Sequence, residues 1–132
     1  MIAIDTSALV AIINNELERE NFLRIINDAD SILLSTVSLL ETRLVAFGRL
    51  IVASVERVNN LLASISPELV PFDLAQSEAA FAAFMADGKG VNSKARLNFG
   101  DCASYALAKT RGVPLLFKGN DFAATDIPAA VT

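Results

Sequence analysis

Four acidic residues stand where short apolar segments give way to helical patterns. Asp5 and Asp121 each follow an apolar segment that reads as a strand, whereas Glu41 and Asp101 each open a predicted helix. In an open α/β sheet, such junctions meet in one crevice at the carboxyl ends of the strands. Carboxylate oxygens are the usual ligands of hard divalent cations. The positions of these acids therefore predict one cluster that binds Mg²⁺ or Mn²⁺.

The absence of histidine narrows the chemistry further. None of the 132 residues is His, which excludes Ser-His-Asp and Cys-His triads and any cleavage of RNA by histidine acid–base catalysis. Zinc is also disfavoured, because its usual ligands are His and paired Cys, and Cys102 is the single cysteine. Carboxylates that bind Mg²⁺ or Mn²⁺ therefore remain as the expected catalytic groups.

Size and composition indicate one domain with an apolar surplus. The 132 residues show no linker, repeat or composition shift, so residues 1–132 are expected to form a single domain. A hydrophobic content of 53% is enough for a real core and leaves apolar surface for a partner or a second copy. The net charge of −4 argues mildly against binding to nucleic acid. Net charge is a poor guide, however, when several acids bind a metal.

The same sequence indicates a cytoplasmic protein that does not enter a membrane. No apolar run approaches the ~18 residues of a membrane span. The N-terminus lacks the positive segment of a signal peptide. A lone cysteine, expected to be buried in its helix, forms no internal disulfide and suits a reducing compartment.

Short apolar segments alternate with longer amphipathic ones. Strands are expected at 2–5, 32–34, 69–70 and 115–117, and helices at 7–14, 16–28, 38–48, 47–65, 73–87 and 101–111. The apolar stripe from Phe47 to Ile65 is predicted to be core, and the polar segment 88–94 a mobile loop. This alternation predicts an α/β fold of three layers, in which helices flank a mainly parallel central sheet.

Each acid also has a purely structural explanation. Asp5 can cap a helix, Ser38 and Glu41 fit the S-x-x-E capping box, and Asn98 and Asp101 form a similar box. An acid near a helix N-terminus is favoured by the helix dipole as well. No single motif separates capping from metal binding, so the prediction rests on the ordered set of four acids.

Four segments, taken in order, resemble PIN-domain ribonucleases, and most closely the VapC toxins of bacterial VapBC toxin–antitoxin systems. The segments are Met1-Ile2-Ala3-Ile4-Asp5-Thr6-Ser7-Ala8, Ser38-Leu39-Leu40-Glu41, Arg96-Leu97-Asn98-Phe99-Gly100-Asp101-Cys102 and Leu115-Leu116-Phe117-Lys118-Gly119-Asn120-Asp121-Phe122. The resemblance spans essentially the whole chain, and the segment that ends in Asp101 and Cys102 is its most specific part.

The resemblance implies a PIN-like fold and a metal-dependent endoribonuclease. Metal-activated water would attack the RNA phosphate and leave a 5′-phosphate and a 3′-hydroxyl. The acidic positions of the family, which serve catalysis and metal binding, match Asp5, Glu41, Asp101 and Asp121. Thr6 or Ser7 matches the small hydroxyl residue that supports the first acid. The resemblance also implies a homodimer and a VapB-type antitoxin, whose extended segment covers the site.

The chain departs from the family in two places. Many relatives carry a second acid where Asn120 stands, and many carry His in the region of Asn92 and Ser93. Four cations are candidate contacts to RNA phosphates: Lys89, Lys94, Arg96 and Lys118. The alternative for these cations is that they are ordinary solvated charges. No base-reading motif is present, so the sequence does not predict the RNA target.

Three other classes of protein are alternatives to a nuclease. A receiver-type phosphotransfer domain would use Asp5, Asp73 and Lys118, but the first strand lacks an adjacent acidic pair and two of the four acids stay unexplained. A haloacid-dehalogenase-like phosphatase needs Asp-x-Asp, and Ser7 stands at the second position. A non-catalytic PIN-like module that binds a protein partner is the third class, and the retention of all four acids counts against it.

Overall fold

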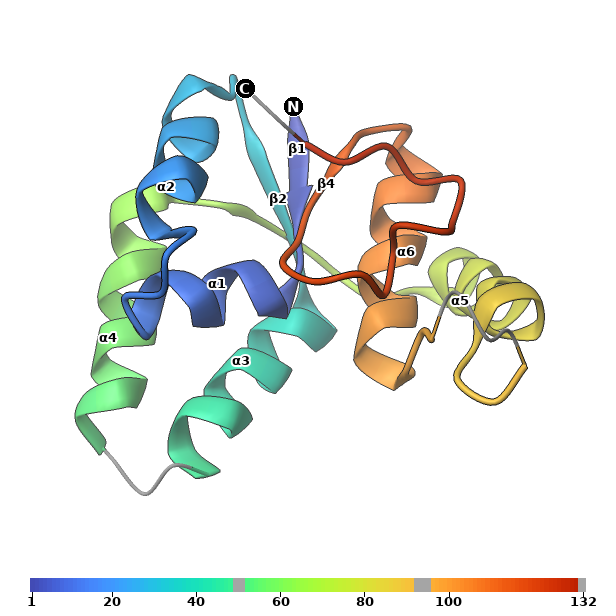
Figure 1. Cartoon of the computed structure of the whole chain (residues 1–132), viewed down its shortest axis with the longest axis horizontal. Coiled ribbons are helices and arrows are strands. Elements are labelled where there is room, and N and C mark those ends of the chain that lie inside the picture. Colours follow the sequence, from blue (N-terminus) through green and yellow to red (C-terminus); the bar gives the residue numbers. More distant parts are fainter. Residues whose placement is uncertain (49–51, 92–95, 131–132) are drawn as a thin grey trace.

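The structure, a computed structural model, describes residues 1–48, 52–91 and 96–130. Four strands form one sheet in the order β3-β2-β1-β4, and every strand pairing among the described residues is parallel (Figure 1). The strands are β1 (Ile2–Ile4), β2 (Ile32–Ser35), β3 (Glu68–Val70) and β4 (Leu115–Leu116). Because β1 pairs with β2 on one side and with β4 on the other, the strand order reverses beside β1. Such a reversal opens a crevice at the carboxyl ends of the strands.

Helices cover both faces of the sheet (Figure 1). They are α1 (Thr6–Ile13), α2 (Arg19–Asp28), α3 (Thr36–Gly48), α4 (Val52–Ile65), α5 (Leu74–Asp87) and α6 (Phe99–Arg111). Helices α1, α2 and α4 lie on one face, and α6, with α5 packed against it, lies on the other. Helix α3 extends beyond the carboxyl ends of the strands. The predicted three-layer α/β fold with a parallel central sheet is confirmed.

The strand side chains divide the core into two halves. Ala3, Leu33 and Leu115 pack with α6, whereas Ile4 and Leu34 pack with α1 and α2. Successive residues of a strand point to opposite faces, so each strand contributes to both halves. A sheet buried on both faces needs continuous apolar strands, which explains why these segments showed no polar alternation.

Three predicted helix starts are wrong by two or three residues. Helix α3 begins at Thr36 and not at Ser38, because the Ser35 hydroxyl accepts the N–H of Val37 at 3.2 Å and supports an earlier start. Helix α2 begins at Arg19 and not at Glu16, since Asn15 adopts a left-handed backbone (φ 54°) and the chain turns before the helix begins. Helix α6 begins at Phe99 and not at Asp101, because Asn98 is its N-cap. The difference at α3 matters for the site.

The apolar stripe from Phe47 to Ile65 is core only in its second half. Val58 is 1% exposed, and Leu62 and Ile65 pack at the edge of the core. Phe47 is 62% exposed, contrary to the prediction. It stands in the last turn of α3, and this helix extends beyond the carboxyl ends of the strands. Ile51, also part of the predicted stripe, lies outside the described residues.

The predicted burial of Cys102 in its helix, α6, is confirmed. Gly112 ends α6 in a left-handed conformation with φ of 65°. The tail adds a parallel bridge between Ala129 and Leu115 beside β4. Within the described part of the chain, the helices are too short or too polar to span a membrane.

Candidate functional site

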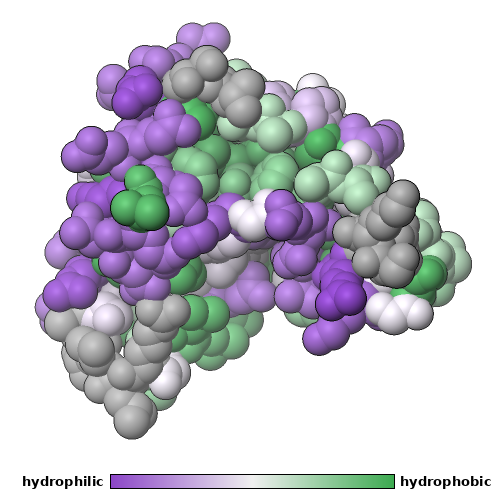
Figure 2. Space-filling view, in the orientation of Figure 1, coloured by the Kyte–Doolittle hydropathy of each residue, from purple (hydrophilic) through white to green (hydrophobic). Residues whose placement is uncertain are grey.

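The crevice lies where β1 and β4 end side by side. The N–H of Asp5 donates to the carbonyl of Leu116 at 2.9 Å, which fixes the end of β1 against the end of β4. The surface is notched here, between the part of the molecule that contains α3 and α4 and the part that contains α5 and α6 (Figure 2). Helices α3 and α6 both begin at this edge of the sheet.

Asp5 is buried and held at both carboxylate oxygens. It is 2% exposed. Its Oδ2 accepts the N–H of Ser7 at 3.0 Å, which caps α1, and its Oδ1 accepts the hydroxyl of Ser104 at 2.5 Å. Burial raises the pKa of Asp5, and these hydrogen bonds partly oppose that rise. The capping interpretation is therefore correct for Asp5, but capping engages only one of its oxygens.

Glu41 lies in the second turn of α3, so it does not open the helix and forms no capping box with Ser38. Its carboxylate rests directly against the backbone of Gly100, in the space that a Cβ at Gly100 would occupy. Burial raises the pKa of Glu41, the hydroxyl of Thr6 opposes the rise through a hydrogen bond, and the charge of Asp5 adds to it. Helix capping therefore does not explain the position of Glu41.

Asp101 takes part in the cap of α6, and its charged form is disfavoured. Asn98 Oδ1 accepts the N–H of Asp101 at 2.9 Å, and Asp101 Oδ2 accepts the N–H of Asn98 at 3.0 Å, so the predicted capping box is present. Burial first, and then the charges of Asp5, Asp121 and Glu41, raise the pKa of Asp101 to about 7. The other three predicted acids therefore all lie within electrostatic reach of Asp101.

Asp121 stands on an exposed turn after β4. Its neighbour Phe122 is 1% exposed and packs its ring against Phe117, with ring centroids 5.1 Å apart. The N–H of Ala123 closes the turn on the carbonyl of Asn120 at 3.1 Å. A buried aromatic anchor thus holds the turn, and Asn120 is exposed beside Asp121.

The donor set suits a hard divalent cation that keeps part of its hydration. Within the described residues, no three Asp, Glu, Cys or His side chains are close enough to hold one ion as they stand. Mg²⁺ commonly uses only one or two protein carboxylates together with several waters. Among the described residues, no Lys or Arg contributes to the pKa shifts of Asp5, Glu41 or Asp101. A bound cation would therefore offset the repulsion among these acids.

The two hydroxyl residues after Asp5 have different neighbours. Thr6 donates to the carbonyl of Ser38 at 3.3 Å and lies against Glu41. The Ser7 hydroxyl accepts the N–H of Lys118 at 3.0 Å, which joins the start of α1 to the segment after β4.

Of the predicted RNA contacts, Lys118 is already engaged in ion pairs. Its ammonium pairs with Glu16 and with Glu18, the latter at 3.2 Å, and thereby ties the α1–α2 connection to the end of β4. Lys89 and Arg96 are exposed on either side of the loop that leads into α6. Lys94 lies outside the described residues, as do Asn92 and Ser93.

Sequence reasoning missed Ser104 and assigned Ser38 only to a cap. Both side chains are fully buried, and their hydroxyls lie 3.1 Å apart beside Asp5. One signal was available: Ser104 stands one helical turn after Asp101, on the same face of an apolar helix.

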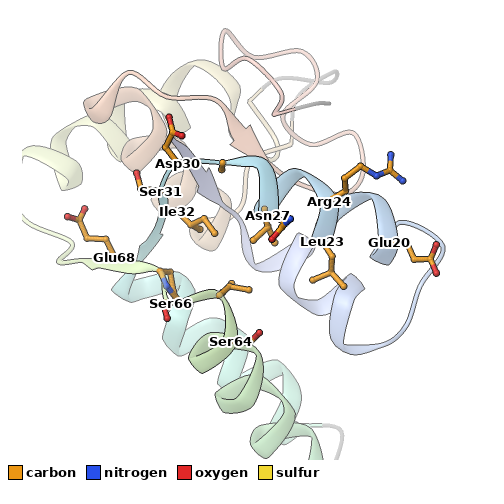
Figure 3. Close-up of a pocket in the computed structure, with 14 residues that line it drawn as sticks. Glu20, Leu23, Arg24, Asn27, Asp30, Ser31, Ile32, Ser64, Ser66 and Glu68 are labelled. Atoms are coloured by element: carbon orange, nitrogen blue, oxygen red, sulfur yellow. The ribbon is translucent and has the colours of Figure 1, made fainter.

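A second pocket lies at the opposite ends of the strands. It has a volume of about 820 Å³ and is bounded by α2, α4 and the starts of β2 and β3, with Arg24, Asp30 and Glu68 among its lining (Figure 3). None of the predicted site residues lines this pocket. The acids at the carboxyl edge therefore remain the candidate site.

Comparison with known proteins gives concordant results. The PIN domain family matches residues 2–128. Ribonuclease VapC30 of Mycobacterium tuberculosis is 46% identical over 125 residues, which cover 94% of this chain and 94% of the relative. The crystal structure of M. tuberculosis VapC20, described as a sarcin-ricin loop cleaving toxin, has a TM-score of 0.80 at 17% identity and covers 100% of both chains. A toxin–antitoxin complex from Klebsiella pneumoniae contains a chain with a TM-score of 0.72 at 16% identity, covering 96% of this chain and 93% of that one.

Asp101→Asn should stabilise the metal-free protein at neutral and alkaline pH. The pKa of Asp101 is about 7 in the folded chain against an ordinary 3.8, so the folded state keeps a proton that the unfolded chain releases between these values. Stability is therefore lost as the pH rises from 3.8 to about 7. Because one pKa unit corresponds to about 1.4 kcal/mol, Asn should recover roughly a few kcal/mol above that range.

The measurement is urea unfolding with EDTA at about pH 4 and about pH 8. Asp73→Asn is the matched control, since Asp73 caps α5 through the N–H of Gln76 at 2.9 Å but takes no part in the acidic group. A gain of the same size at both pH values, or in the control, would contradict the account.

Gly100→Ala should disturb the site without unfolding the protein. The added Cβ meets the carboxylate of Glu41, which is the far end of a flexible side chain and can move away. We expect nearly unchanged stability but Mn²⁺ affinity lower by about tenfold or more, as measured by calorimetric titration. Gly48→Ala is the control, because a Cβ there meets nothing within 4 Å. Equal Mn²⁺ affinity in both variants would place Glu41 outside the metal site.

Proposed function

This chain belongs to the PIN-domain family and is a VapC-type ribonuclease, and we propose that it cleaves RNA with Mg²⁺ or Mn²⁺ as the toxin of a type II toxin–antitoxin pair. The family match spans nearly the whole chain, which supports treating residues 1–132 as a single PIN-like domain. We further propose that it acts in the cytoplasm. The observation that supports metal dependence is that burial, and then the charges of Asp5, Asp121 and Glu41, raise the pKa of Asp101 to about 7.

Each acid has a proposed part in the reaction. Asp5 and Asp101 are the most enclosed and would hold the cation, while Glu41 and Asp121 border the same crevice and would bind its hydration water or orient the attacking water. When bound, the cation would lower the pKa of a water and stabilise the charge on the scissile phosphate. Thr6 and Ser7 would support these acids, through Glu41 and Asp5 respectively.

Purified protein should cleave RNA only when a divalent cation is present, leaving 5′-phosphate and 3′-hydroxyl ends. Asp5→Asn should lower the cleavage rate by at least about a hundredfold, because it removes charge at the centre of the acidic group. The measurement is end mapping of total RNA after incubation with wild type or variant, with Mg²⁺ or with EDTA. The variant also controls for a contaminating nuclease, whose activity would persist in it.

The same assay decides between the proposed function and its alternative. If well-folded wild type binds Mn²⁺ but leaves RNA intact, the chain is a non-catalytic PIN-like binding module. The receiver-type phosphotransfer class has less support, because Asp73 is occupied as the cap of α5 and Lys118 pairs with Glu16 and Glu18.

We propose a VapB-type antitoxin as the protein partner. The chemistry of the crevice supports this pairing, because a partner Arg can bind two carboxylate oxygens at once and neutralise part of the acidic group. The antitoxin's extended segment would then occupy the position of the RNA and the metal.

Expression of the chain alone should arrest growth, and co-expression of a small protein encoded next to it should restore growth. Asp101→Asn should remove the arrest while the protein still binds that partner, since the substitution keeps the shape of the crevice. Co-purification of the partner with each version measures the second part. Harmless expression of folded wild type would count against a toxin.

We propose that Lys89, Lys94 and Arg96 bind RNA phosphates. The exposed Lys89 and Arg96 lie on the loop that leads directly into α6 and Asp101, which favours contact with a substrate in the crevice. Lys118 is a weaker candidate, because it would have to leave Glu16 and Glu18 to meet a phosphate.

Replacing Lys89, Lys94 and Arg96 by Ala should weaken RNA binding and reduce the salt dependence of the affinity, because fewer counterions are released. Turnover at saturating RNA should change much less, since phosphate contacts position the substrate. The control is replacement of Arg24, Arg57 and Arg111, which are exposed on helices away from the crevice. An unchanged salt slope in the first triple variant would mark its cations as solvated charges.

A homodimer is a further proposal. Helix α3 exposes Leu40, Leu44 and Phe47, and α5 exposes Phe81 and Met85, each more than half exposed. Apolar side chains concentrated on two helices are typical of surfaces that pair with a second copy.

A further inference from the structure

The two oxygens of the Asp5 carboxylate are held from different parts of the chain. Oδ2 accepts the N–H of Ser7, a local contact that any N-cap makes. Oδ1 accepts the hydroxyl of Ser104, which lies 99 residues away on α6, at 2.5 Å. An ionised carboxylate has about four lone-pair positions on its two oxygens, so accepting hydrogen bonds does not by itself prevent Asp5 from binding a cation.

Ser104 is in turn oriented by Ser38. Their hydroxyl oxygens are 3.1 Å apart, and neither side chain is exposed to solvent. A serine hydroxyl has one hydrogen, and that of Ser104 is directed at Asp5. Ser38 must therefore donate to Ser104, which gives a one-way chain of donors from α3 through α6 to the acid. Donors aligned in this way strengthen one another at a buried charge.

Further contacts fix the position of Ser38. The Thr42 hydroxyl donates to the Ser38 carbonyl at 2.7 Å, and the Thr6 hydroxyl donates to the same carbonyl at 3.3 Å. Buried hydroxyls cost free energy unless they are hydrogen-bonded. Within the described chain, the one buried side-chain polar atom without a partner is Gln76 Oε1, so every hydroxyl in this group is satisfied.

We propose that Ser104, aligned by Ser38, is a positioning residue that fixes the Asp5 carboxylate in the orientation in which it binds the divalent cation. The contact joins α6, which carries Asp101, to Asp5 at the end of β1, and Ser38 joins both to α3, which carries Glu41. Packing of α3 against α6 is thereby coupled to the geometry of the acids. The part that concerns the cation rests on the proposed metal-dependent nuclease.

The test compares Ser104→Ala with Ser104→Cys. Alanine removes the hydroxyl and is smaller than serine, whereas cysteine is larger and only a weak donor, so the two variants weaken the same hydrogen bond with opposite effects on packing. We expect both variants to lower Mn²⁺ affinity by about 10- to 100-fold and to lower kcat more than KM for RNA. Ser38→Ala, which acts one step further away, should have a smaller effect in the same direction.

A second readout uses the metal-free protein. The carboxyl ¹³C signal of Asp5 should titrate at a higher pH in both Ser104 variants than in wild type, because a donor to the charged form is lost. Wild-type affinity, kcat and Asp5 titration in Ser104→Cys would overturn the proposal and leave the nuclease standing. Conversely, a wild type that neither binds Mn²⁺ nor cleaves RNA, with Asp5 still shifted in both variants, would refute the nuclease and retain the positioning of Asp5.

Discussion

The burial of several carboxylates in one crevice is the constraint on which the site depends. Asp5, Glu41 and Asp101 all have raised pKa values, and burial is the largest cause for each. A protein does not gain stability by placing such groups together, because each charge disfavours the next. Their arrangement is favourable once a divalent cation supplies the opposite charge, and this connects the electrostatics of the fold to its chemistry.

The fold meets this constraint with contacts that also build its helices. Asp5 caps α1 and Asp101 completes the capping box of α6, so the residues that start two helices are also the residues that face the crevice. Capping and metal binding are therefore not alternatives for these two acids. Helix N-termini stabilise negative charge, which partly offsets the repulsion in the absence of a cation. Glu41 differs, because its carboxylate occupies the space that a side chain at position 100 would fill, and Gly100 has none.

The sequence was sufficient to predict the parallel sheet and the layers, because the apolar strands are marked locally. It was not sufficient where a contact joins distant segments. Local pattern assigned Ser38 to a cap, yet Ser35 serves the start of α3 and Ser38 turns inward to meet Ser104. Phe47 fitted the helical spacing of a core stripe but extends past the sheet, where nothing in the described chain covers it. The spacing of apolar side chains predicts which face of a helix is apolar, but it does not predict whether another element packs against that face.

The central claim is that these acids hold a divalent cation. Its most direct test is the anomalous scattering of crystals grown with Mn²⁺, for wild type and for Asp101→Asn. The account predicts one peak or a close pair in the crevice beside Asp5 and Asp101, with Glu41 and Asp121 reaching the ion directly or through water, and loss of that peak in the variant. A crevice without Mn²⁺ in wild type, or a peak of equal height in Asp101→Asn, would contradict it.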